Sequence, residues 1–133
     1  MNAFCKRGAF ALVAILLTLV VGCAQPIRNV SGAPVVTSTK SPSMNAIGEA
    51  IKQAGMGLGW VMTEQSPGKI IGTLNLRTHQ AVVAVTYDAT SYNINYVDSH
   101  DLKYDAQKGT IHRNYNGWIQ NLNNAIQTRL SII

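Results

Sequence analysis

Cysteine is nearly absent from this chain, and its absence excludes a fold held together by disulfide bonds. The only cysteines among the 133 residues are Cys5 and Cys23. Cys5 lies in an N-terminal segment with the features of a secretion signal, which is removed from a mature chain. A disulfide needs two cysteines, and at most one is left. Stability must therefore come from packing, for which about ninety residues suffice to form one core.

Charged residues are also few, and they form no surface suited to nucleic acid. They make up 13% of the chain, with a formal net charge of +5. Lys6 and Arg7 belong to the N-terminal signal, and the remaining nine basic and six acidic residues give +3. The basic residues between Arg28 and Arg129 are scattered. Because nucleic-acid binding requires a basic patch or stripe, a nucleic-acid partner is not expected.

Recognisable catalytic and metal-binding patterns are missing as well. His79, His100 and His112 are far apart, and none has a second ligand three or four residues away, as a helical metal site would require. Asp98 and Asp101 flank His100 in a segment that we interpret as a solvated turn, with a loop cation site as the alternative. The serines have no nucleophile-elbow context. We therefore expect no metal, no cofactor and no enzymatic activity.

The first 23 residues follow the pattern of a lipoprotein signal peptide. Lys6 and Arg7 give a positive start, Ala9–Val21 is almost wholly apolar, and the small residue Gly22 precedes Cys23. The apolar run is shorter than the roughly 17–25 residues of a membrane-spanning helix. This order predicts cleavage before Cys23 and lipidation of that cysteine. The alternative is a signal cleaved elsewhere, with an incidental cysteine.

Lipidation at Cys23 would fix the location of the protein. Several acyl chains hold a protein on a bilayer far more firmly than a single chain does. In Gram-negative bacteria an aspartate after the lipidated cysteine retains a lipoprotein at the inner membrane, and Ala24 departs from that signal. We expect an outer-membrane anchor facing the periplasm, with the inner membrane as the less favoured alternative.

The rest of the chain is predicted to be a linker followed by one domain. Residues 1–22 are the signal peptide, 23–43 the lipidated N-terminus and a flexible linker, and 44–133 a single α+β domain. The linker is predicted from its prolines, serines and threonines, which alternate without an apolar period. As an alternative, Val35–Val36 adds a short edge strand.

Alternating residues predict an antiparallel meander of about four strands. The strands are expected at 60–65, 69–77, 81–87 and 92–97, with connections too short for crossover helices. One face carries Ile70, Leu74, Val83, Val85, Tyr92 and Ile94, with Leu76 and Tyr96. The opposite face is polar and nearly uncharged. This pattern is typical of a sheet with helices on one side and water on the other.

Two amphipathic helices are predicted to flank the meander. Ser41 is the expected N-cap of the first, with Pro42 at its first position and its end near Gly55. A longer C-terminal helix is expected to begin after Asn114, or one turn earlier at Thr110, and to pack on one sheet face.

A spaced set of turn, aromatic and aliphatic residues runs through the predicted domain. It comprises Gly59-Trp60, Pro67-Gly68, Ile70, Thr73-Leu74, Arg77, His79, Val83, Val85, Tyr87, Tyr92, Ile94, Tyr96, Leu102, Tyr104, Ile111-His112, Tyr115-Asn116, Trp118-Ile119 and Leu122. Over residues 45–126 this set resembles a family of short uncharacterised bacterial lipoproteins. The resemblance implies a single domain and a lipoprotein location, and it implies no reaction.

Two functional hypotheses follow, both of binding rather than catalysis. In the first, the domain contacts an envelope protein through its polar sheet face or an unpaired edge strand. Arg77, His79, Tyr87 and Tyr104 are candidate contacts at the sheet margin. In the second, a pocket near His112 and Trp118 binds a small molecule, a glycan or an enzyme. The candidate interaction residues are thus Arg77, His79, Tyr87, Tyr104 and His112, with the membrane bound through Cys23.

Overall fold

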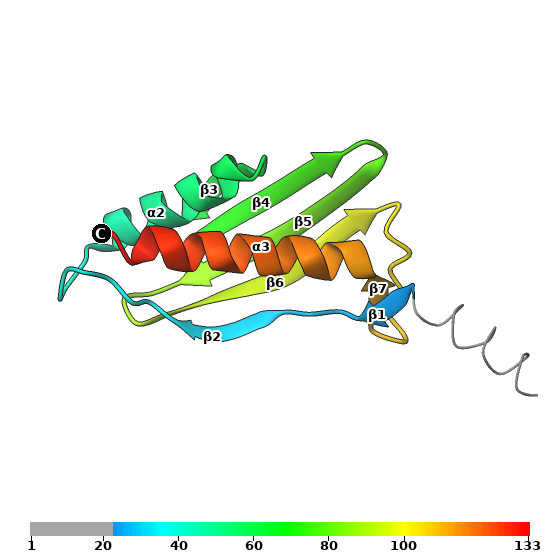
Figure 1. The fold of residues 1–133 in the computed structure, drawn as a ribbon, viewed down its shortest axis with the longest axis horizontal. Coiled ribbons are helices and arrows are strands. Elements are labelled where there is room, and N and C mark those ends of the chain that lie inside the picture. Colours follow the sequence, from blue (N-terminus) through cyan, green and yellow to red (C-terminus); the bar gives the residue numbers. More distant parts are fainter. Residues whose placement is uncertain (1–22) are drawn as a thin grey trace, which may run out of the picture.

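The structure, a computed structural model, describes residues 23–133 (Figure 1). Its elements are β1 (Ala24–Pro26), β2 (Val30–Pro34), α2 (Met44–Gly57), β3 (Val61–Ser66), β4 (Lys69–Leu76), β5 (His79–Tyr87), β6 (Ser91–His100), β7 (Thr110–His112) and α3 (Arg113–Leu130). The predicted signal peptide lies outside the described residues. No helix between residues 23 and 133 combines the length and apolarity needed to cross a membrane.

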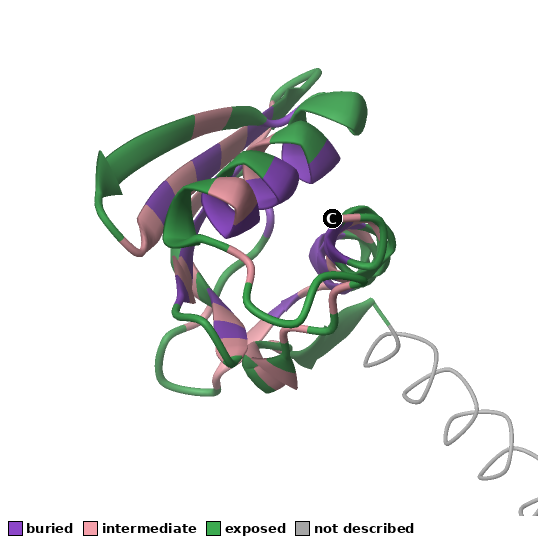
Figure 2. Cartoon of the chain, turned by 90° about the vertical axis from the view of Figure 1, so that its left-hand side faces the viewer, coloured by how far each residue is buried: buried purple, intermediate pink, exposed green. Residues whose placement is uncertain are grey.

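The chain is an α+β protein with one five-stranded antiparallel sheet. The strand order is β2-β6-β5-β4-β3, and β1 pairs with β7 in a separate two-stranded ribbon. The predicted meander is present as β3 to β6. The prediction of about four strands is one short, because β2 adds to the free edge of β6. Both helices lie on one face of the curved sheet (Figures 1 and 2).

The segment predicted as a flexible linker is where the structure differs most from the expectation. Two of the strands, β1 and β2, lie inside residues 23–43. Pro26 and Pro34 stand at the ends of these strands, where proline disrupts a ladder least. Gly32, with a φ of 64°, lies where the register shifts between Val30 and Ala33, as a bulge requires. The segment therefore covers a sheet edge that would otherwise be open.

The alternative prediction of a short edge strand is confirmed, but the strand lies at other residues than Val35–Val36. The strand occupies Val30–Pro34, immediately before the Val35–Val36 pair. The Val35 N–H still donates to the Thr90 carbonyl at 2.9 Å, so the chain follows the sheet one residue beyond β2.

The first helix differs from its predicted ends for identifiable reasons. Ser43 rather than Ser41 is the N-cap, because the Ser43 hydroxyl accepts a hydrogen bond from the Ala46 N–H at 3.0 Å. The helix continues past Gly55 to Gly57. A β-carbon at Gly55 would overlap the Met62 side chain, so this glycine permits close packing rather than ending the helix.

The second helix also begins earlier than Asn114. The His112 ring accepts a hydrogen bond from the Asn114 N–H through Nδ1 at 3.1 Å, which makes His112 the N-cap. Its own N–H donates to the Leu102 carbonyl at 2.8 Å. The start of α3 is therefore fixed by the short strand β7 that leads into it.

The core fills the space between the sheet and the two helices. The predicted inward residues of the meander are buried, including Ile70, Val83, Val85 and Ile94, each at most 1% exposed. Burying such a side chain contributes about 1.5–3 kcal/mol. Leu76 differs from the prediction and is 45% exposed, because it ends β4 beside a turn. In Figure 2 buried residues alternate with less buried ones along the strands, and both helices carry buried residues.

Candidate binding groove and the surface around Cys23

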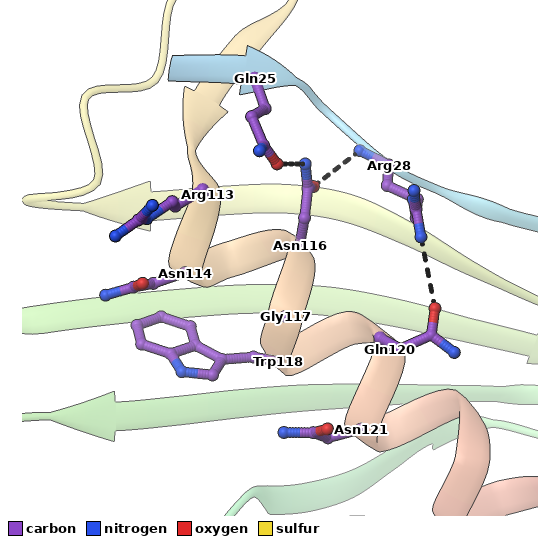
Figure 3. A pocket seen from close by; sticks show the side chains of 9 residues that line it. All are labelled: Gln25, Arg28, Arg113, Asn114, Asn116, Gly117, Trp118, Gln120 and Asn121. Atoms are coloured by element: carbon purple, nitrogen blue, oxygen red, sulfur yellow. Dashed lines mark hydrogen bonds between the residues drawn. The ribbon is translucent and has the colours of Figure 1, made fainter. Parts of the chain in front are cut away.

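An open groove of about 520 Å³ lies over the N-terminal half of α3 (Figure 3). Its lining residues come from α3 and from the chain around β1: Gln25, Arg28, Arg113, Asn114, Asn116, Gly117, Trp118, Gln120 and Asn121. In Figure 3 the side chains of Arg113, Asn114, Trp118 and Asn121 project to one side of the helix. Those of Gln25, Arg28, Asn116 and Gln120 gather on the other, and Gly117 lies between the two sets. We call this the Gly117 groove.

One wall of the groove is held in place by Asn116. This residue is only 9% exposed. Its side-chain oxygen accepts the Arg28 N–H at 2.9 Å, and its amide group donates to the Pro26 carbonyl at 3.0 Å and to Gln25 Oε1 at 3.3 Å. Arg28 in turn donates to Gln120 Oε1 at 3.3 Å. These bonds fix the chain after β1 against α3, so the wall is formed before any ligand binds.

The floor of the groove is a glycine that the fold does not require. Gly117 lies inside α3, its φ is not positive, and a β-carbon there would meet no heavy atom within 4 Å. Glycine inside a helix costs roughly 0.5–1 kcal/mol relative to alanine. Neither backbone conformation nor packing explains that cost. What glycine does provide is a bare floor between the two walls.

The chemistry of the groove suits recognition of polar groups. Its lining supplies primary amides, two guanidinium groups and the indole of Trp118. Amides both donate and accept hydrogen bonds, and guanidinium groups donate to hydroxyl or carboxylate oxygens. None of the nine lining residues carries a carboxylic acid, imidazole, thiol or hydroxyl, the usual nucleophiles and proton-transfer groups. The groove thus offers hydrogen-bond donors, hydrogen-bond acceptors and one aromatic surface.

Cys23 lies directly against the folded domain. It is exposed, and its carbonyl accepts a hydrogen bond from the Arg113 N–H at 3.2 Å. The next residue, Ala24, already pairs with His112 in the β1–β7 ribbon. No free chain separates Cys23 from the ribbon or from the start of α3.

Arg77 and His79 lie at the same end of the molecule as β7. Arg77 is exposed in the turn between β4 and β5, with a φ of 58°. His79 Nδ1 lies 2.7 Å from the Asp101 carbonyl oxygen, and its ring centroid lies 6.3 Å from that of Trp118. His79 therefore connects the β4–β5 turn to the segment after β6.

The two tyrosines predicted to make contacts have different surroundings. Tyr104 is 42% exposed and stacks on Tyr96 with ring centroids 4.2 Å apart. Tyr87 is only 8% exposed and is not available as a contact, because its hydroxyl fills the space that Gly48 of α2 leaves. Burial, followed by the charge of Glu64, raises the pKa of Tyr87.

The pocket expected near His112 and Trp118 is only partly as predicted. Trp118 lines the Gly117 groove, whereas His112 does not, because its ring caps α3. Trp118 is the one groove residue that the sequence prediction included, and Asn116, Gly117 and Arg28 are among those that it missed. A glycine on the polar side of an otherwise regular amphipathic helix is the one sequence signal that pointed to this place.

The loop considered as a cation site has no suitable ligand cluster. Within residues 23–133, no three His, Cys, Asp or Glu side chains lie close enough together to hold a metal ion. Asp98 instead accepts the Ser99 N–H at 2.9 Å, and Asp101 accepts the Thr78 hydroxyl at 2.5 Å.

Comparison with known proteins adds no further assignment. No protein-family model, no curated protein and no solved structure matches this chain. The resemblance to short bacterial lipoproteins over residues 45–126 stays a prediction from the sequence.

Proposed function

We propose that this chain is a lipid-anchored module of the bacterial cell envelope that binds a partner without transforming it, and that the Gly117 groove is its binding site. The observation that carries the proposal is Gly117 itself. The chain keeps a destabilising residue in a helix where only the shape of the groove benefits. Loss of stability in favour of a site is typical of functional positions.

The anchor in this proposal is a lipid on Cys23. The signal-like sequence before Cys23 supports it, as does the exposure of that residue in the folded chain. The location proposed with it is the outer membrane, facing the periplasm. Cys23→Ala is expected to leave the domain folded and to release it from the membrane fraction. Retention of the Cys23→Ala chain in washed membranes would refute the anchor.

The ligand class that best fits the groove is an oligosaccharide of the cell envelope. Sugar hydroxyls match the amides of Asn114, Asn121 and Gln120, which donate and accept. Arg28 and Arg113 suit the carboxylate groups that many envelope sugars carry. The indole of Trp118 offers an apolar surface for the C–H face of a sugar ring.

A pair of glycine variants tests the groove. Gly117→Gln places a side chain on the floor of the groove and is expected to abolish the binding of soluble amino-sugar oligosaccharides. Binding is measured by the change in Trp fluorescence and by NMR shifts of the side-chain amides. Gly57→Gln is the matched control. A β-carbon at Gly57 would likewise have no heavy atom within 4 Å, and Gly57 lies in α2 rather than in the groove. Equal binding by both variants would refute the groove as the site.

A second candidate function is contact with an envelope protein through the outer face of the sheet. The face turned away from the helices carries Thr73, Asn75, Thr86, Asn93 and Asn95 around Val82, together with two charged residues, Lys69, which pairs with Thr86, and Asp98, which pairs with Val82. Because β2 covers the edge of β6, a partner that adds a strand to the sheet would pair with β3 at the other edge. Asn75→Asp/Asn95→Asp should lower the recovery of a crosslinked protein partner. An unchanged set of crosslinks would argue against this face.

A further inference from the structure

We infer that the end of the domain that carries Cys23 rests directly on the bilayer surface, so that the domain has a fixed polarity on the membrane. The inference deepens the proposed function and rests on lipidation of Cys23. It follows from the missing tether. A flexible linker of about twenty residues would span on the order of 25 Å and let the domain tumble.

The attachment leaves no such freedom. Ala24 is both the residue after the anchor and the first residue of β1, which pairs with β7 at three positions. The Cys23 carbonyl is bound by the Arg113 N–H, and the Ile27 N–H donates to the Gly109 carbonyl at 2.9 Å. The lipid would therefore be attached to a cysteine whose own backbone is hydrogen-bonded to the first residue of α3.

The surface beside Cys23 is built from several chain segments. Figure 1 shows β1, β7, the loop that joins β6 to β7, and the β4–β5 turn at one end of the molecule. The β5–β6 turn and the C-terminus of the chain lie at the other end. Since β6 has ten residues and a strand rises about 3.3 Å per residue, the two ends are about 30 Å apart.

The side chains exposed at the Cys23 end suit a lipid headgroup layer. Lys103 and Lys108 are exposed, and within residues 23–133 neither of them has a carboxylate oxygen within 4.0 Å. Tyr104 adds a partly exposed aromatic ring with a polar tip. Basic and aromatic residues of this kind favour the surface of an anionic leaflet.

The acidic groups at this end, Asp98, Asp101 and Asp105, each accept a hydrogen bond within the protein, Asp98 from the Ser99 N–H at 2.9 Å. Asp101 accepts the Thr78 hydroxyl and lies 3.4 Å from His79 Nδ1. Asp105 accepts the backbone N–H groups of Gln107 and Lys108, both at 3.0 Å. Arg77, His79 and Tyr104, which the sequence suggested as protein contacts, thus belong to the end that we assign to the membrane.

Energy transfer from two probe positions to the bilayer tests this polarity. The lipidated mature chain is reconstituted in vesicles of phosphatidylethanolamine and phosphatidylglycerol with acceptor-labelled headgroups. A donor fluorophore is attached to Gln107→Cys, in the β6–β7 loop, or to Ala89→Cys, in the β5–β6 turn; both positions are exposed. Energy transfer is expected to be several-fold more efficient from position 107 than from position 89. Equal transfer, or stronger transfer from position 89, would overturn the inference.

An inserted tether is the matched control. A flexible Gly/Ser segment of about twenty residues between Cys23 and Ala24 restores a reach on the order of 25 Å, and it should bring the two probes to similar transfer. A difference that persists unchanged after the insertion would overturn the short attachment as its cause. Release of the Cys23→Ala chain from membranes, combined with equal transfer from both probes, would leave the anchor intact and refute only the polarity.

Discussion

Gly48 offers a direct test of how α2 packs on the sheet. This glycine is buried in α2 and faces Tyr87 of β5. A β-carbon at position 48 would overlap the Tyr87 hydroxyl and would lie 3.1 Å from the ring carbon that bears it. Tyr87 is 8% exposed, so its ring has little space into which to move. Gly48→Ala should therefore force the helix and the strand apart.

The expected magnitude combines two opposing effects. Overpacking a core by one methyl group typically costs about 1–3 kcal/mol. Replacing a helical glycine with alanine returns about 0.5–1 kcal/mol of helix propensity. The variant should therefore lose about 0–2.5 kcal/mol of unfolding free energy. In a Tyr87→Phe background the hydroxyl is gone and only the 3.1 Å contact with the ring carbon remains, so Gly48→Ala should cost about 1 kcal/mol less than it does with Tyr87 intact.

A double-mutant cycle measures this coupling. Urea unfolding of residues 23–133 carrying Cys23→Ala gives the free energy for the parent, the two single variants and the double variant. A coupling energy between Gly48→Ala and Tyr87→Phe of about 1 kcal/mol or more is expected. If Gly48→Ala stabilised the domain with Tyr87 intact, the close approach of α2 and β5 would be refuted.

Three other variants test particular groups. The Tyr115 hydroxyl is buried without a hydrogen-bond partner within residues 23–133, so Tyr115→Phe should be neutral or should stabilise by about 1 kcal/mol in urea unfolding; a clear loss of stability would mean that the hydroxyl has a partner. Asn116→Ala should cost about 1–3 kcal/mol and speed amide exchange in residues 24–34, whereas the exposed Asn121→Ala should change stability by about 0.5 kcal/mol or less; similar losses for both would contradict the bridging role of Asn116. The hydrogen bond from the Thr90 N–H is the largest of several that lower the pKa of Asp88 below 3.8. Since the ionised form is favoured in the folded state, its stabilisation is present above pH 3.8 and is lost as pH falls through the lowered pKa. The melting-temperature gap between the parent and Asp88→Asn should therefore narrow only in that acidic range, and a gap independent of pH would refute the assignment.

The meander was predictable because its signal is local. Val83 and Val85 alternate with Val82 and Ala84, and the short turns between strands leave only antiparallel neighbours. The apolar stripe of α3 was visible for the same reason, since residues three and four apart share a helix face. Each pattern lies in one continuous stretch of sequence, such as Lys69–Tyr87 for the pair β4 and β5 and Arg113–Leu130 for α3.

The N-terminal strands were missed because their partners are remote. The Gly32 N–H donates to an Asn93 side chain 61 residues away, and the Arg28 N–H donates to Asn116 across 88 residues. Read alone, residues 23–43 have the prolines and hydroxyl residues of a linker. Nothing local reveals that β6 and Asn116 provide their hydrogen-bond partners, so the wall of the groove was missed with them.

The position of β1 and β2 also fixes the order in which the protein can fold. These strands are made first, yet the residues with which they pair lie from 57 (Pro34 and Ser91) to 88 (Ala24 and His112) residues later in the chain. Contacts that close such long loops form late, because the entropy of closure must be overcome before they contribute. The hairpins of β3 to β6 pair strands that follow one another in the chain, so they close only short loops and can form early. A chain emerging from its N-terminus therefore keeps Cys23 free of β7 and α3 until the last helix is made. Under the lipid anchor that we propose, the acylating enzyme would meet that open chain before the domain closes.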